Sequence, residues 1–256
     1  MIDLHCHLLP GIDDGPATVA DAVAQARGHL LVGVTTVAAT PHAGPSMPND
    51  ADGIRRTTDA LRSELAARDV ALEVVTGAEV DLAWGLDLDD RTLSAMTLGY
   101  GGGSGGSLLV EAPLRLQPHV ALGIRELLVR GHRVLLAHPE RSPVFHREPK
   151  ALAALVKEGV RVQVTAGALS GRFGGTVQRH SRALVDAGLC HVVASDAHDV
   201  RRRHPGMADD LRAAGLENGA AIWCDEIPSA ILAGADVPAV VYDVGRRRRF
   251  GRRPRG

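Results

Sequence analysis

The amino-acid sequence predicts an α/β fold, a distorted seven-stranded (β/α) barrel with a metal site at the C-terminal ends of its strands. Short apolar runs alternate with amphipathic stretches, and such alternation indicates parallel strands joined by helices. Metal-binding side chains follow almost every apolar run. A barrel brings all strand ends to one rim, whereas an open sheet gathers them only at its switch point, so the barrel is favoured.

Seven apolar runs are expected as strands and five amphipathic stretches as helices, from the spacing of their apolar residues. Several of the helices are expected to end at a glycine, because glycine readily adopts the left-handed backbone that closes a helix. These helix-ending glycines are Gly33, Gly131, Gly159 and Gly188. The strands are expected near 2–6, 34–40, 72–78, 107–111, 133–137, 160–165 and 191–195, and the helices near 18–31, 52–67, 118–130, 149–157 and 177–187.

The composition is that of a soluble globular protein. The 256 residues are 45% hydrophobic and 23% charged, which suits one domain with a sizeable core. Aromatic residues make up only 3%, which argues against nucleic-acid recognition by base stacking. No apolar run reaches the roughly 18 residues of a membrane span, and no secretory signal is visible. We therefore expect a cytoplasmic protein without a transmembrane segment.

Two segments stand apart from the expected domain, which covers residues 1–244. The C-terminal stretch 245–256 holds seven arginines and no acidic residue. We expect this tail to be disordered, and the alternative is an electrostatic contact with an anionic membrane surface, polymer or nucleic acid. The glycine-rich stretch 99–107 lacks the G-K-[ST] of a phosphate-binding loop, so it is expected to be a flexible connector.

The metal site is predicted from imidazole and carboxylate side chains near the expected strand ends. Such a mixture without thiolate suits Mn, Fe or Zn, whereas Mg and Ca prefer oxygen ligands alone. Nine candidates are too many for one tetrahedral ion, and they suit two or three ions that share carboxylates. The candidates are His5, His7, Asp14, His42, Glu79, Glu111, His138, Asp196 and His198.

The arginines and cysteines indicate which substrate the site binds and which catalytic mechanisms are excluded. Arg141 and Arg203 follow candidate ligands closely, and guanidinium groups bind phosphate in a bidentate manner. The alternative is that each arginine is a surface residue. For Arg203, the neighbouring Arg201 and Arg202 are also candidates for binding phosphate. Cys6 lies between two candidate histidines, but alternate strand residues face opposite sides, so its thiol is expected to point away. No cysteine is followed by the Cys-x5-Arg pattern of cysteine-dependent tyrosine phosphatases, and no G-x-S-x-G elbow of a serine hydrolase occurs.

The motifs together resemble the PHP (polymerase and histidinol phosphatase) superfamily. They are most similar to its bacterial manganese-dependent protein-tyrosine phosphatases, which are associated with capsule and exopolysaccharide synthesis. The similarity runs from residue 1 to about 207, and the set of motifs is far more specific than any one of them. The matching stretches are 1–15 (MIDLHCHLLPGIDDG), 39–42 (ATPH), 137–141 (AHPER), 163–167 (QVTAG) and 194–198 (ASDAH).

This resemblance implies a barrel of PHP type that holds three divalent metal ions, with Mn²⁺ expected and Fe or Zn as alternatives. It implies phosphate binding by Arg141 and Arg203, and a phosphotyrosine protein as substrate, namely the tail of a bacterial tyrosine kinase. The ligand sets that it implies are His5, His7, Glu79 and Asp196 for one ion, Glu79, Glu111 and His138 for a second, and Asp14, His42 and His198 for a third.

Three other functions stay open at this point. The same fold could hydrolyse a small phosphate ester such as histidinol phosphate or a nucleotide. A nuclease could use the basic tail to hold its substrate. A catalytically silent regulatory module is the third alternative, although no expected ligand position is substituted in this sequence.

Overall fold

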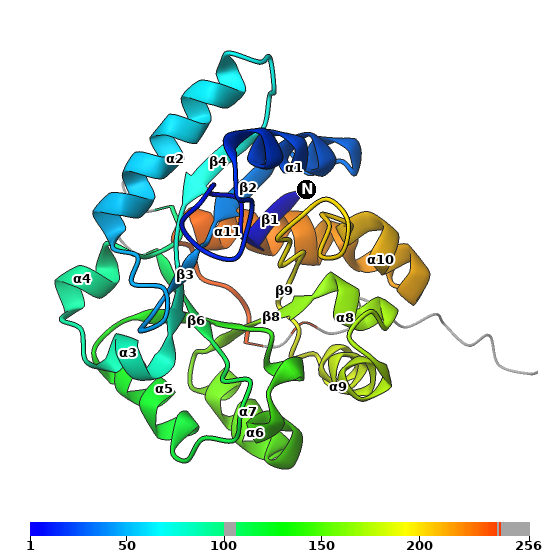
Figure 1. Cartoon of the computed structure of the whole chain (residues 1–256). Coiled ribbons are helices and arrows are strands. Elements are labelled where there is room, and N and C mark those ends of the chain that lie inside the picture. The colour runs from blue at the N-terminus through cyan, green and yellow to red at the C-terminus, as the bar shows by residue number, and fades with distance from the viewer. Residues whose placement is uncertain (100–105, 240, 242–256) are drawn as a thin grey trace, which may run out of the picture.

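The computed structural model describes residues 1–99, 106–239 and 241, and in it parallel strands are surrounded by helices (Figure 1). Most strand residues are buried, as parallel strands covered on both faces should be. The described residues form nine strands, which are β1 (Ile2–Cys6), β2 (Thr36–Ala39), β3 (His42–Ala43), β4 (Glu73–Thr76), β5 (Glu79–Asp81), β6 (Ser107–Glu111), β7 (Arg133–Ala137), β8 (Arg161–Thr165) and β9 (Val192–Ala194).

The strands pair in two sheets in which every pairing is parallel. One sheet has the order β1-β2-β4, and the other has the order β3-β5-β6-β7-β8-β9. The two sheets meet where the chain leaves β1 and β9. There the backbone N–H of Asp196 donates to the carbonyl oxygen of His5, and that of His7 donates to Ala197, both at 2.9 Å. The expected α/β architecture with parallel strands is therefore confirmed.

The strand count differs from the expected seven because a short additional strand follows each of two expected runs. The run 34–40 gives β2, and β3 begins beyond it after Pro41, a residue without a backbone N–H to donate. The run 72–78 gives β4, which ends before Gly77, and β5 begins beyond the run. A Cβ at Gly77 would lie 2.7 Å from the Leu98 side chain, so this close approach favours glycine. Glu79 consequently begins a strand, whereas the sequence predicted it at a strand end.

The helices lie outside the strands (Figure 1). The first helix begins at a cap in which the Thr18 side chain accepts from the N–H of Asp21. The four predicted helix-ending glycines all have positive φ. The helix expected near 118–130 begins later, because His119 before it is left-handed with φ 61°. The bounds are α1 (Val19–Leu31), α2 (Ala51–Ala66), α3 (Leu82–Leu86), α4 (Asp90–Ser94), α5 (Val120–Val129), α6 (Pro143–Arg147), α7 (Pro149–Lys157), α8 (Ala166–Ser170), α9 (Gly175–Asp186), α10 (Met207–Ala214), α11 (Ile227–Leu232), the 3-10 helices η1 (Pro139–Arg141) and η2 (Glu217–Gly219), and the π-helical η3 (Ile222–Glu226).

Two sequence predictions fall mainly on residues that the structure does not describe. The arginine-rich tail 245–256 lies outside the described residues, and so does most of the glycine-rich stretch 99–107. No described helix combines the length and the apolar character that a membrane crossing requires.

Candidate metal centre

The nine predicted side chains converge at the end of the strands where β1, β6, β7 and β9 terminate. His5 lies in β1, Glu79 begins β5, and Asp196 follows β9, and all three are almost fully buried. Potential ligand atoms within 4.8 Å of one another form four overlapping groups, which are His7, Asp14, His42 and His198; His5, His7 and Asp196; His5, Glu79 and His138; and His42, Glu79 and Glu111.

The hydrogen bonds of His5 fix which of its ring nitrogens carries the proton. Its Nδ1 lies 3.0 Å from Gln163 Oε1, and that oxygen also accepts from the backbone N–H of His138 at 3.2 Å. Since that Gln163 atom accepts from a backbone donor, it is the amide oxygen, and His5 Nδ1 must donate to it. The Nε2 of His5 therefore presents a lone pair, as a metal-ligating imidazole does.

His7 and His198 are held in the same tautomer. His7 Nδ1 donates to Asp13 Oδ2 at 2.8 Å, and His198 Nδ1 donates to the backbone oxygen of Asp196 at 3.0 Å. Both rings therefore carry their lone pair on Nε2, and that of His198 accepts from Arg203 Nη1 at 2.7 Å. Asp13 also accepts from the backbone N–H of His42 at 3.1 Å, so one carboxylate orients two of the predicted ligands.

The ring nitrogens of His5 and His7 lie close to two carboxylate oxygens. Their Nε2 atoms lie 3.3 Å apart. Each lies 3.3–3.5 Å from Glu79 Oε2 and from Asp196 Oδ1. Two ligands that bind one tetrahedral ion at about 2.1 Å lie roughly 3.4 Å apart, so each carboxylate oxygen has the spacing of a ligand that shares an ion with His5 and His7.

The buried oxygens of this group support the fit to a cation. Glu79 Oε2 and Asp196 Oδ1 are buried, and neither has a hydrogen-bond partner among the described residues. A buried carboxylate oxygen without a partner is costly unless a cation compensates it. The Nε2 lone pairs of His5 and His7 lie beside these oxygens. A cation bound between them would accept the lone pairs and compensate the negative charge of the carboxylates. The donor set therefore fits divalent ions.

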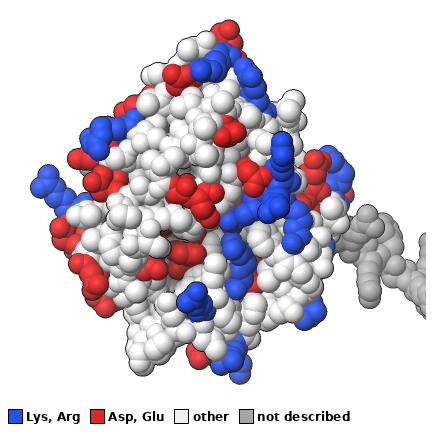
Figure 2. Space-filling view, in the orientation of Figure 1, with Lys and Arg blue, Asp and Glu red and all other residues white. Residues whose placement is uncertain are grey.

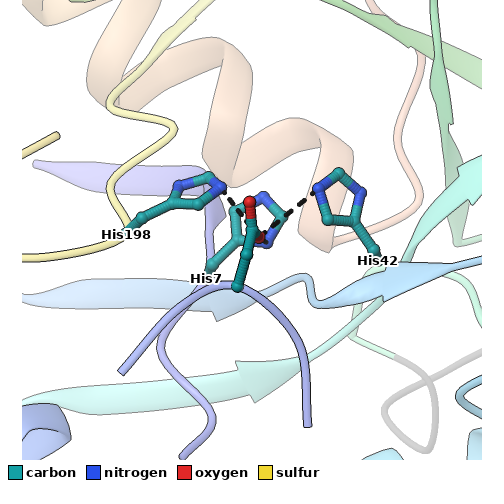
Figure 3. Close-up of side chains that lie close together, drawn as sticks. His7, His42 and His198 are labelled. Carbon is teal, nitrogen blue, oxygen red and sulfur yellow. Dashed lines mark ion pairs between the residues drawn. The ribbon is translucent and has the colours of Figure 1, made fainter. Parts of the chain in front are cut away.

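A neighbouring group centres on Asp14, which lies in the loop after β1. Its Oδ1 is 3.2 Å from His198 Nε2, 3.6 Å from His42 Nε2 and 3.8 Å from His7 Nδ1. Figure 3 shows the three histidine rings arranged around one carboxylate. His42 also reaches Glu79 Oε2 with its Nδ1 at 3.1 Å, so its ring joins the two groups.

The third expected set, Glu79, Glu111 and His138, is divided in the structure. His138 Nε2 lies 2.7 Å from Glu79 Oε1, in a group completed by His5. Glu111 instead lies near Glu79 in a group completed by His42. Glu79 thus belongs to both arrangements and is the side chain around which the site is organised.

The carboxylates of the site have pKa values that differ from their ordinary ones. Burial alone would raise the pKa of the Glu79 carboxyl, but the charges of His5 and His138 hold this pKa well below its ordinary value. Burial would also raise the pKa of Asp196, but the charge of His5 and then contacts with His7 and Arg203 hold it well below its ordinary value. Burial, and next the charge of Glu79, raises the pKa of Glu111 to about 7. Two carboxylates are therefore ionised in the metal-free protein at neutral pH, whereas Glu111 needs further positive charge nearby to ionise fully.

The backbone carries strain at two of these residues. His138 has φ 33° and Asp196 has φ 51°, a left-handed conformation that costs a non-glycine residue about 1–2 kcal/mol. His138 directly follows β7, and Asp196 lies two residues after the end of β9. Backbone strain of this kind is concentrated at functional sites, where the surrounding structure holds it in place.

Both predicted arginines contact one carboxylate oxygen of the site, and Arg203 also contacts His198. Arg141 Nη1 and Arg203 Nη2 lie 2.7 Å and 2.5 Å from Asp196 Oδ2. Asp196 thus directs Oδ1 toward His5 and His7 and Oδ2 toward the arginines. The Arg141 guanidinium also lies 5.0 Å above the Phe173 ring, a cation–π contact. Figure 2 shows basic side chains beside the centre of this face, with acidic ones on the other side.

Three contributing residues were not predicted as site residues. Asp13 stands beside a predicted ligand in an acidic pair, and Gln163 lies in one of the matched motifs, so both had a signal in the sequence. Phe173 had none. As predicted, Cys6 takes no part in these groups, since its Sγ lies 3.3 Å from Gln25 Nε2 and 3.2 Å from His29 Nε2.

Comparison with known proteins agrees with the resemblance found in the sequence. The family model for capsular polysaccharide synthesis proteins CpsB/CapC matches residues 1–221. The chain belongs to this family. Its relatives include the tyrosine-protein phosphatase YwqE of Bacillus subtilis, with 34% identity over 93% of this chain and 91% of YwqE. Another is the tyrosine-protein phosphatase CpsB of Streptococcus pneumoniae, with 24% identity over 81% of this chain and 86% of CpsB.

The fold of this CpsB/CapC family member is similar to a solved structure as well. That structure comes from a crystallographic study of YwqE from Bacillus subtilis and CpsB from Streptococcus pneumoniae, which describes them as metal-dependent tyrosine phosphatases. The TM-score is 0.79 with 30% sequence identity, and the match covers 94% of this chain and 98% of the solved chain. The similarity therefore extends over nearly the whole of both chains.

Proposed function

We propose that this chain is a metal-dependent phosphatase that hydrolyses phosphotyrosine in proteins. The observation that carries the proposal is the convergence of the His5 and His7 ring nitrogens on the carboxylates of Glu79 and Asp196, at 3.3–3.5 Å and beside two arginines. Membership of the CpsB/CapC family and the similarity to named tyrosine phosphatases support the substrate class.

The proposed centre holds three divalent ions, with Mn²⁺ as the physiological metal and Fe or Zn as alternatives. All nine predicted side chains serve as ligands in this proposal, with Glu79 shared between neighbouring ions. Asp13 and Gln163 hold His7 and His5 in the tautomer that can bind a metal. When bound, the ions would lower the pKa of a water and stabilise negative charge on the phosphate.

Arg141 and Arg203 bind the phosphate oxygens in this proposal. A guanidinium matches the geometry of a phosphate and stabilises the charge that builds up during its transfer. Asp196 orients both arginines through Oδ2, so the phosphate-binding groups stay beside the ions. The phenol released from phosphotyrosine has a pKa of about 10, so its departure needs less help from a general acid than that of an alkoxide.

The biological setting is part of the same proposal. The substrate would be the tail of a bacterial tyrosine kinase that controls capsule or exopolysaccharide synthesis, in keeping with the description of the family. The cytoplasmic location stays a prediction. We also infer that the two sheets act as one distorted seven-stranded barrel, which the hydrogen bonds between the ends of β1 and β9 support.

The test compares phosphotyrosine peptides with histidinol phosphate and a nucleotide monophosphate, before and after removal of metal with a chelator. We expect preferential hydrolysis of the peptides, loss of activity on chelation, and recovery with Mn²⁺. A marked preference for a small phosphate ester would overturn the proposed substrate class. Full activity of a His138→Ala variant would argue against catalysis at this centre.

A further inference from the structure

A cavity opens beside the candidate metal centre and shares His198 with it. Its volume is about 430 Å³, and it is bounded by the loop after β1, by α1 and by the loop after β9. Its apolar surface comes from Pro16, Ala17 and the exposed Val200. None of the roles described above uses this cavity. Because His198 lies at its edge, a molecule bound at the metal centre could extend directly into it.

The rim of the cavity carries positive charge without a partner. Arg201 and Arg202 line the cavity and are exposed, and neither guanidinium forms an ion pair within the described part of the chain. Two acids also line it, but other groups engage them. Asp199 accepts from the backbone N–H groups of Arg201 and Arg202 at 2.5 Å and 2.6 Å, and Asp21 accepts from Thr18 at 2.7 Å.

A buried glutamine in the cavity wall joins the two loops that border the cavity. Gln25 is fully buried and lines the cavity. Its Nε2 donates to the backbone oxygens of His7 and Ala197, both at 3.1 Å, which fixes the orientation of the amide. Its Oε1 accepts no hydrogen bond from the described residues. This atom has no exposed surface, so Gln25 holds the loops after β1 and β9 together at the cavity wall and offers no acceptor to a bound molecule.

We propose that this cavity binds the polypeptide next to the phosphotyrosine, and that Arg201 and Arg202 select acidic side chains in that segment. The inference rests on the proposed phosphatase function and extends it to substrate choice. The phosphotyrosine enters the metal centre, and the neighbouring residues lie over Pro16, Ala17 and Val200. Carboxylates in the segment meet the two unpaired guanidinium groups, which attract them electrostatically.

The test uses phosphotyrosine peptides that differ only in two flanking residues, which are Glu, Gln or Lys, placed before or after the phosphotyrosine. We expect kcat/KM to be highest for Glu on one side and lowest for Lys. Since each exposed pair contributes little, the Glu-to-Gln preference should be about three- to tenfold, and added salt should reduce it. Each value is divided by that for a small aryl phosphate, which removes effects on the metal centre itself.

The double variant Arg201→Gln/Arg202→Gln should abolish the preference for Glu over Gln. A control with the same change in charge, Arg56→Gln/Arg147→Gln, alters two exposed arginines that do not line the cavity and should keep the preference. An unmodified protein that hydrolyses all the peptides equally would overturn the cavity inference alone. An unmodified protein that hydrolyses none of them, while it cleaves small phosphate esters, would overturn the proposed function. A preference that survives the double variant would show that other residues select the segment.

Discussion

We assign Asp13 no contact with a metal ion or with the phosphate, but replacing its carboxylate should weaken metal binding. Its carboxylate accepts from His7 Nδ1 at 2.8 Å, from the Gly15 N–H at 2.9 Å and from the His42 N–H at 3.1 Å. Asp13→Ala removes all three bonds and frees the His7 ring to rotate or change tautomer. Loss of such an outer carboxylate usually lowers metal affinity about 10- to 100-fold. That corresponds to about 1.4–2.8 kcal/mol, the range of one hydrogen bond to a charged group.

In the assay, the metal-free protein is titrated with Mn²⁺ in a calorimeter, and the heat of binding gives the Mn²⁺ affinity. Asp50→Ala provides a matched control, since Asp50 also accepts a backbone hydrogen bond, from Gly53 at the start of α2. The control loses the same charge and about 1 kcal/mol of stability, but it lies outside the groups of candidate ligands. Equal Mn²⁺ affinity in the two variants would refute the role given to Asp13.

Three further predictions concern the arginines, the pH and the fold. Arg141→Lys keeps the charge but loses the bidentate geometry, so kcat/KM for a phosphotyrosine peptide should fall about tenfold or more in steady-state assays, and an unchanged value would contradict phosphate binding by Arg141. Burial lowers the pKa values of His5 and His7, but the neighbouring carboxylates outweigh it and raise both. Mn²⁺ must therefore displace protons, and its affinity should fall from about pH 8 to about pH 6 in calorimetric titrations, whereas a pH-independent affinity would exclude these ligands. Thr18→Ala should lower the free energy of unfolding in urea by about 1 kcal/mol through loss of the α1 cap, and no change would show that this cap contributes nothing.

The candidate ligands could be predicted from the sequence because their signal is local. Each is a histidine or an acid near the end of an apolar run, and parallel strands bring those ends together. The positions of the α-helices α1, α2, α7 and α9 followed in the same way from apolar spacing and end signals.

The parts that were missed depend on contacts between distant segments. Gln163 lies 158 positions from His5 in the sequence, and no local pattern predicts the hydrogen bond between them. The breaks at Pro41 and Gly77 had signals that went unused, since proline and glycine both interrupt strands. The preference for glycine at position 77 comes from Leu98, which belongs to another part of the chain. Grouping Glu111 with His42 likewise required the three-dimensional arrangement.

Anomalous diffraction at the manganese absorption edge, from crystals of the full chain grown with Mn²⁺, tests the central claim most directly. The account predicts one peak enclosed by His5, His7, Glu79 and Asp196, with two more beside Asp14 and beside Glu111. Crystals that show no anomalous peak between the His5 and His7 rings, although the protein binds Mn²⁺ in solution, would contradict it.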